Sequence, residues 1–211
     1  MLISFKDSIQ KYGLKINGII HVGAHYGQEY AEYARAGVRE VVFIEPCSKA
    51  FEGLKAALGQ TPGVILINSA CGAEFGIATM NVEQANQGMS NSLLKPAKHL
   101  QQYPSIQFTE TEEVEVHPLD EFELFRCVMN MLVMDVQGYE LEVLKGATET
   151  LKWIDYIYTE VNRDEVYEGC AKVHQLDEFL TDFQRVETNW GGGTWGDAWY
   201  IRKSLLNYTP H

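Results

Sequence analysis

Acidic side chains end three of the most apolar runs in the chain. Glu45 follows VVFI, Asp135 follows MLVM, and Glu160 closes YIYT. An unpaired carboxylate is costly to bury, so we expect these groups to face a cleft or a partner. At a strand end, a carboxylate can accept the hydroxyls of a ribose or take a proton from a reacting hydroxyl. For Asp135, capping of the next helix is the alternative.

A glycine-containing turn follows the first apolar run, in HVGAHYG at residues 21–27. Gly23 and Ala24 remove side-chain bulk, which lets a ligand approach the backbone and offers helix N-terminal N–H groups to a carboxylate or phosphate. The spacing to Gly27 is G-x-x-x-G and not the dinucleotide pattern G-x-G-x-x-G. Together with Glu45 as a ribose acceptor, the turn favours an adenosine-type cofactor. A plain strand–helix turn is the alternative.

The histidines of this turn do not indicate a metal site. A metal pair needs at least a third ligand, and no spacing singles out His99, His117 or His174 for that role. We therefore predict no metal. We expect His21 to make a polar contact near the cofactor and His25 to belong to the loop itself.

Small and polar residues also follow the apolar run VILIN and the run MLVM that precedes Asp135. Ser69 and Ala70 come after VILIN, where a flat base could pack on the chain. Gln137 follows Asp135 at the end of the strongest predicted strand. These residues extend the expected cofactor site along the strand ends.

The composition describes one ordinary domain without nucleic-acid character. The chain has 211 residues, a net charge of −12 and 45% hydrophobic residues. An acidic surface repels phosphate backbones and anionic membranes, so we predict neither as a partner. No apolar run approaches the roughly 18 residues that a membrane helix needs, and the N-terminus lacks a signal-peptide core. We expect a cytoplasmic protein whose four scattered cysteines are plain thiols.

Strand and helix patterns alternate along the chain, which predicts a parallel sheet covered on both faces. Ligands on such sheets bind outside the carboxyl ends of the strands. The segment 84–104 is polar and rich in turn residues, and so long a stretch is usually functional or mobile. We predict strands at 19–22, 41–45, 64–68, 76–82, 113–117, 131–136 and 156–161, helices at 29–37, 48–59, 139–151 and 173–183, and a closing hairpin around GGGTWG.

Five stretches together resemble the FkbM family of S-adenosylmethionine-dependent methyltransferases. They are HVGAHYG, FIEP, SNSLLKPAKHLQQYP, VHPLDEF and, most specifically, MDVQGYELEVLKGA. The resemblance runs from about residue 18 to about residue 202. It implies an α/β Rossmann-like class I methyltransferase fold: a mostly parallel seven-stranded sheet with an antiparallel C-terminal hairpin and helices on both faces. We expect residues 1–211 to form this single domain.

The resemblance also implies S-adenosylmethionine as the cofactor and methyl transfer to a hydroxyl of a small molecule or carbohydrate. Many members of the family open the glycine loop with Asp, where this chain has His21. Carried over by position, the implied contacts are the methionine part at Gly23 to Gly27 (with Ala24 and His25), the ribose at Glu45, the adenine at Ser69 and Ala70, and the sulfonium and acceptor beside Asp135 and Gln137.

An aliphatic hydroxyl is a poor nucleophile, so we expect a base near it. Asp135 and Glu160 are the candidates, with His99 as a further one. We predict that residues 84–112 form a lid or insertion on the acceptor side, where Ser90, Ser92 and His99 bind the substrate. A solvated loop is the alternative.

Two other functions fit parts of the sequence. A non-catalytic protein could keep the cofactor pocket without chemistry. A nicotinamide-dependent oxidoreductase would share the strand-end acid, but the turn after the first strand lacks G-x-G-x-x-G and the chain has no Tyr-x-x-x-Lys. The sequence does not predict the oligomeric state.

Overall fold

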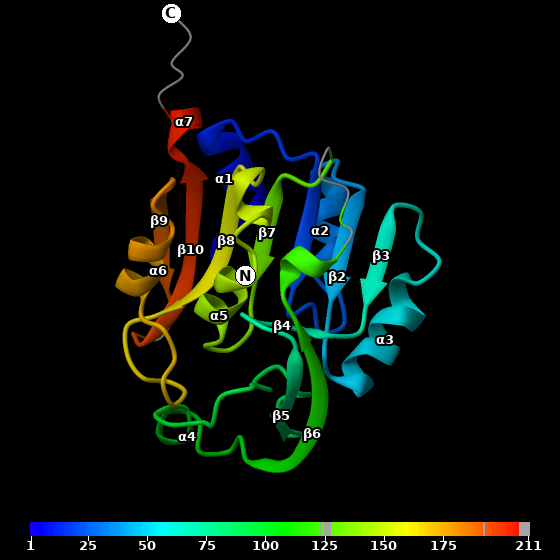
Figure 1. Ribbon diagram of the computed structural model, residues 1–211, viewed down its shortest axis with the longest axis vertical. Helices are drawn as coiled ribbons and strands as arrows, with labels where there is room; N and C mark the ends of the chain where they lie inside the picture. Colours follow the sequence, from blue (N-terminus) through cyan, green and yellow to red (C-terminus); the bar gives the residue numbers. More distant parts are fainter. Residues whose placement is uncertain (123, 125–127, 192, 207–211) are drawn as a thin grey trace, which may run out of the picture.

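A seven-stranded sheet forms the centre of the computed structural model, which describes residues 1–122, 124, 128–191 and 193–206. Its strand order is β3-β2-β1-β7-β8-β10-β9 (Figure 1). Only β10 runs antiparallel to its neighbours, β8 and β9. The predicted fold class is therefore confirmed. The strands are β1 (Gly18–Val22), β2 (Glu40–Ile44), β3 (Val64–Ile67), β7 (Met131–Met134), β8 (Tyr156–Asn162), β9 (Phe183–Trp190) and β10 (Trp195–Arg202).

The chain reverses its direction of travel across the sheet between β1 and β7. It moves outward from β1 to β2 and β3, and later returns to the other side of β1. Val22 is level with Ile44 of β2 and with Met134 of β7. The residues that follow these three strands therefore emerge at one edge, at the switch point where ligands of such sheets bind.

Helices cover both faces of the sheet. One face packs against α1 (Phe5–Tyr12), α2 (Tyr30–Arg35) and α3 (Ser48–Leu58) through a cluster that includes Phe5, Tyr33 and Leu54. The other face packs against α5 (Glu140–Lys145) and α6 (Val173–Phe179) through Leu144 and Leu176. Because both faces are covered, successive residues of β1 and β7 are buried, which explains their continuous apolar runs.

Several predicted helix boundaries were wrong by a few residues. The helix predicted at 139–151 ends after Lys145 and resumes as the short η2 (Thr150–Lys152). Gly146 separates them, and a Cβ there would lie 1.9 Å from the carbonyl oxygen of Gly72. The helix predicted at 48–59 begins at Ser48 and ends at Leu58, with Cys47 as its N-cap. The helix α1 was not predicted.

A second sheet of three strands lies beside the carboxyl edge of the first (Figure 1). It contains β4 (Ala70–Cys71), β5 (Gly76–Glu83) and β6 (Phe108–His117), in the order β4-β6-β5. The sequence predicted strands at 76–82 and 113–117 but not that they pair with each other outside the main sheet. Met80 and Val116 of this sheet pack on Cys47 and Ala50, so the second sheet stands against the start of α3.

The predicted lid segment, 84–112, is tied to two other parts of the chain. It contains turns, the short helix α4 (His99–Gln102) and the first half of β6. Ser92 pairs with Asn81 of β5, and Pro96 forms a bridge to Tyr167 in the loop after β8. Its role as an acceptor-side lid stays a prediction, as does the single-domain assignment.

The remaining elements are η1 (Leu119–Glu121) and α7 (Lys203–Leu206). In the part of the chain that the structure describes, no helix is both long and apolar enough to cross a bilayer. Cys47, Cys71 and Cys170 are buried free thiols, as predicted, and Cys127 lies outside the described residues.

Candidate active site

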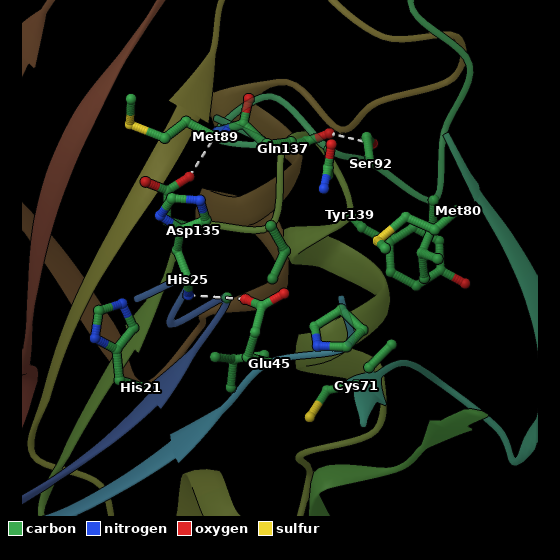
Figure 2. A pocket seen from close by; sticks show the side chains of 18 of the residues that line it. His21, His25, Glu45, Cys71, Met80, Met89, Ser92, Asp135, Gln137 and Tyr139 are labelled. Carbon is green, nitrogen blue, oxygen red and sulfur yellow. Dashed lines mark hydrogen bonds between the residues drawn. The ribbon is translucent and has the colours of Figure 1, made fainter. Parts of the chain in front are cut away.

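A cavity of about 210 Å³ lies where β1, β2 and β7 end. Figure 2 shows Glu45 near its middle, with Cys71, Met80 and Tyr139 to one side and His25 and Asp135 to the other. The cavity collects residues that are far apart in the sequence. The predicted site residues that line it are His21, Gly23, His25, Glu45, Ala70, Ser92, Asp135 and Gln137.

The turn after β1 is shaped by close backbone contact between β1, β2 and β7. Gly23 has φ +80°, and a Cβ there would lie 1.9 Å from the carbonyl oxygen of Asp135. The N–H groups of Gly23 and Ala24 donate to the carbonyl of Ile44 at 2.9 and 3.1 Å. These two N–H groups are therefore bonded to β2, and the expected contact between helix N-terminal N–H groups and a ligand stays a prediction.

Two residues of the predicted loop do not line the cavity. Ala24 is buried in the core beneath the turn. Gly27 has φ +72° and packs on α3, where a Cβ would lie 2.6 Å from Leu54 Cδ1 and 2.8 Å from Leu58 Cδ1. Both residues shape the turn, and their predicted contact with a cofactor stays a prediction.

Glu45 connects the two turns that border the cavity. Its Oε2 accepts from the N–H of His25 and its Oε1 from the N–H of Cys47, each at 2.8 Å. Burial raises the pKa of Glu45 to about 7, against the opposing effect of these two hydrogen bonds. Each carboxylate oxygen keeps a further lone pair, so Glu45 can still accept the hydroxyls of a ribose.

The side of the cavity around Tyr139 is largely apolar. Pro46, Cys71, Met80 and Leu93 line it together with Tyr139. Such walls suit a flat, uncharged base. Ser69, predicted on this side, is buried and donates instead to the carbonyls of Ala70 and Glu115. The sequence missed Met80 and Leu93, since each belongs to a segment whose place beside the main sheet was not foreseen.

His21 is buried in β1 and packs on the rings of Tyr33 and Phe43. Its Nδ1 lies 3.2 Å from the hydroxyl of Tyr33. Burial lowers the pKa of His21 to about 3, so the ring is neutral. A neutral imidazole at the cavity wall is compatible with a cationic ligand.

A glutamine bridges the two predicted catalytic acids. Nε2 of Gln137 donates to Asp135 Oδ1 at 2.7 Å and to Glu160 Oε2 at 3.0 Å. Its Oε1 accepts from the hydroxyl of Tyr167 at 2.9 Å, and its carbonyl accepts from Ser92 Oγ at 2.8 Å. Gln137 itself has φ +51°, a strained conformation for a residue with a Cβ. The two hydrogen bonds from Nε2 keep the carboxylates of Asp135 and Glu160 next to each other.

The acids around this bridge disfavour full ionisation. Burial raises the pKa of Glu160 well above its ordinary value, and the negative charge of Asp135 raises it further. Asp135 is exposed to the cavity, yet desolvation by the surrounding protein, and then the charge of Asp197, raises its pKa. Two neighbouring carboxylates in such a site hold a proton more readily than either would alone. The pair is thus suited to receive a proton.

Asp135 does not cap α5, because in the described structure the N-cap is Tyr139 and has no side-chain cap hydrogen bond. Glu140 Oε1 accepts from the N–H groups of Val136 and Gly138, at 3.2 and 3.1 Å. Glu140 is fully buried, and burial raises its pKa to about 7. Asp135, whose side chain is accessible from the cavity, is therefore free of that structural role.

A second cavity, of about 410 Å³, adjoins the first. The two cavities share Met1, Met89, Asp135 and Gln137. The second also contains the predicted residues Ser90, His99 and Glu160. The sequence missed Tyr103, Trp195 and Asp197, which complete its polar and aromatic walls. Ser92, predicted to bind the substrate, lines the first cavity and holds the backbone of Gln137.

His99 is buried among aromatic rings at the edge of the second cavity. Its ring centroid lies 5.2 to 5.4 Å from those of Tyr103, Phe108 and Tyr167. Burial lowers the pKa of His99, and its buried Nδ1 has no hydrogen-bond partner among the residues that the structure describes. Across the described ranges, no group of three or more His, Cys, Asp or Glu side chains could hold a metal ion.

The sheet order and the position of the cavity define a Rossmann-like methyltransferase fold. A methyltransferase from Aquifex aeolicus described as SAM dependent has a TM-score of 0.51 at 12% identity, over 95% of this chain and 90% of that one. The magnesium protoporphyrin IX methyltransferase ChlM from Synechocystis PCC 6803, solved with bound SAM, has a TM-score of 0.50 at 10% identity, over 92% and 74%. At these identities the similarity shows the fold alone.

The profile of the methyltransferase FkbM domain matches residues 21–186, and the chain belongs to this family. The predicted family is thereby confirmed, and S-adenosylmethionine as the cofactor agrees with it. The chain is also 34% identical over 100 residues to the 2-O-methyltransferase NoeI of Sinorhizobium fredii strain NBRC 101917 / NGR234. That match covers 46% of this chain and 41% of NoeI.

Proposed function

We propose that this chain is an S-adenosylmethionine-dependent O-methyltransferase that acts on a hydroxyl of a small molecule or carbohydrate. One observation carries the proposal: Asp135 and Gln137 form a common wall between two adjoining cavities at the switch point of the sheet. The first cavity suits a nucleoside and the second suits an acceptor. The family and the name of NoeI support methyl transfer to oxygen.

The chemistry of the first cavity fits S-adenosylmethionine. Apolar side chains around Tyr139 would face the adenine, and Glu45 would accept the ribose hydroxyls. Glu29 and Asp135 on the opposite side would attract the cationic sulfonium and amino groups. When bound, the cofactor supplies a methyl group on a positively charged sulfur.

The carboxylate pair would act as the base for the acceptor. A hydroxyl placed at the common wall would lose its proton to Asp135 or Glu160 while its oxygen forms a bond to the methyl carbon. The bound cofactor would supply the methyl group, and the electron pair of its carbon–sulfur bond would stay on the sulfur as the neutral thioether. The negative charge of the carboxylate and the positive charge of the sulfonium thus disappear together. Gln137 holds both acids in position and prevents their separation.

Two measurements test this function. Calorimetry should detect binding of S-adenosylhomocysteine, and little or none of NAD. Hydroxylated acceptors incubated with S-adenosylmethionine should give methyl ethers, and Asp135→Asn and Glu160→Gln should each slow this turnover steeply. Binding of the cofactor without turnover on any acceptor would instead favour a non-catalytic binding protein. Absence of cofactor binding would refute the proposal.

The partners follow from the same chemistry. The net charge of −12 argues against a nucleic-acid acceptor. A small hydroxylated molecule or a carbohydrate is the acceptor class that we propose, and a cytoplasmic location stays a prediction. Methylation of RNA by the purified chain would contradict this part of the proposal.

A further inference from the structure

The lining of the second cavity is acidic. The inference from this lining rests on the proposed function and makes its substrate class narrower. Among the described residues that line the cavity, three are carboxylic acids and none is Lys or Arg. Asp135, Glu160 and Asp197 lie on β7, β8 and β10 or directly after them, so the sheet itself fixes their positions.

The other titratable groups of the lining do not reverse this charge. His99 is held neutral by its burial. Even with one proton shared by Asp135 and Glu160, two carboxylates remain, and no described Lys or Arg of the lining opposes them. Phosphate and carboxylate groups are commonly bound by Arg or Lys, and this lining offers neither to them.

The remaining walls suit an uncharged ring that carries hydroxyls. Trp195 Nε1 donates to the hydroxyl of Tyr103 at 2.8 Å, which joins two aromatic side chains into one wall. Ile106 and Val166 add apolar surface, and Ser90 and Asn86 add neutral polar groups. Carboxylates accept hydrogen bonds from hydroxyls, while aromatic rings pack on the apolar faces of a ligand. The volume of about 410 Å³ is within the usual range for small-molecule sites.

We propose that the second cavity binds an uncharged, hydroxyl-rich ring of the glycoside type and excludes acceptors that carry phosphate or carboxylate. Like charges at close range penalise an anionic acceptor. We expect neutral glycosides to bind about 100-fold more tightly than the matching sugar phosphates or uronates.

Ligand-observed NMR on the protein saturated with S-adenosylhomocysteine tests the inference without turnover. The probes are neutral methyl hexopyranosides, the corresponding hexopyranoside phosphates, and uronates. Binding of the neutral glycosides alone supports the inference. Equal or tighter binding of the anionic sugars would overturn it, and so would absence of binding by every neutral glycoside. The proposed function is tested separately, by cofactor binding and turnover.

Two neighbouring residues offer a matched pair of variants. Ile106 lines the cavity and is half-buried, whereas Gln107 is exposed and outside the lining. Ile106→Lys should improve the binding of anionic sugars about tenfold relative to neutral ones. Gln107→Lys adds the same charge outside and should leave the ratio unchanged. Asn86→Lys, also in the lining, is the second variant if Ile106→Lys does not fold. An unchanged ratio in every folded lining variant would contradict the inference.

Discussion

The hydrogen bonds from Gln137 lower the pKa of both acids, against the larger effect of desolvation, and Gln137→Met tests this contribution. Methionine has a similar length but cannot donate to Asp135 Oδ1 or Glu160 Oε2, which Nε2 of Gln137 contacts at 2.7 and 3.0 Å. The φ of +51° places the same strain on both side chains, so the backbone cost is nearly constant. The exchange therefore removes the side-chain hydrogen bonds of Gln137, including the one that its Oε1 accepts from the Tyr167 hydroxyl.

The magnitude follows from the charge of the acceptors. A hydrogen bond to a charged group contributes about 1.5–3 kcal/mol. Both bonds favour the ionised carboxylates, so their loss raises the pKa of the pair. Since one pKa unit corresponds to about 1.36 kcal/mol, the acid limb of the kcat/KM profile should move to higher pH by about one unit or more.

The assay measures kcat/KM for methyl transfer between pH 5 and 9 (about two units either side of neutrality). Gln101→Met, at an exposed position of α4, is the control and should keep the wild-type profile. Calorimetry with S-adenosylhomocysteine shows whether the cofactor site is intact. A Gln137→Met profile with an unmoved acid limb would refute the reasoning, because the pair would then titrate independently of the glutamine.

Three further substitutions test the fold and the cofactor site. Gly23→Ala should destabilise the protein by about 3 kcal/mol or more in urea denaturation, since its Cβ would meet a backbone oxygen and φ is +80°. Glu45→Gln should weaken S-adenosylhomocysteine binding about tenfold or more by calorimetry; an unchanged Kd would remove Glu45 from the ribose site. The pKa of Glu45 rises from 4.5 to about 7 on folding, so its ionisation lowers wild-type stability as the pH increases through that window. The stability of Glu45→Gln relative to wild type should therefore grow by up to about 3 kcal/mol between pH 4.5 and 8, as measured in urea at each pH. Tyr167→Phe, which removes the hydroxyl bonded to Gln137 Oε1, should lower kcat more than it raises KM. The control is Tyr200→Phe, which removes a hydroxyl bonded to Asp177 outside both cavity linings; an equal loss from it would mean that the effect is not specific to the bridge.

The first half of the site could be predicted from the sequence because parallel strands end at one edge. Glu45 and Asp135 each follow a run so apolar that it had to be a buried strand, and the register of β1 with β2 and β7 makes their ends level. What the sequence could not supply was the pairing of β5 with β6. Alternation of apolar residues identifies a strand without naming its partner. The place of Met80 at the cofactor wall depended on that pairing.

Trp195 and Asp197 of the second cavity were not predicted for a different reason: β10 runs antiparallel to its neighbours. An antiparallel strand begins where its parallel neighbours end, so the first residues of β10 lie beside the last residues of β8. Asp197 pairs with Glu160 in this register, and Trp195 pairs with Asn162. A search of the residues that follow strands therefore finds Glu160 but passes over Asp197 and Trp195, which precede or open one. The antiparallel strand β10 thus places an acid, Asp197, and an aromatic side chain, Trp195, in the lining of the second cavity. The pairing of β10 with β8 therefore fixes where both side chains stand in that lining.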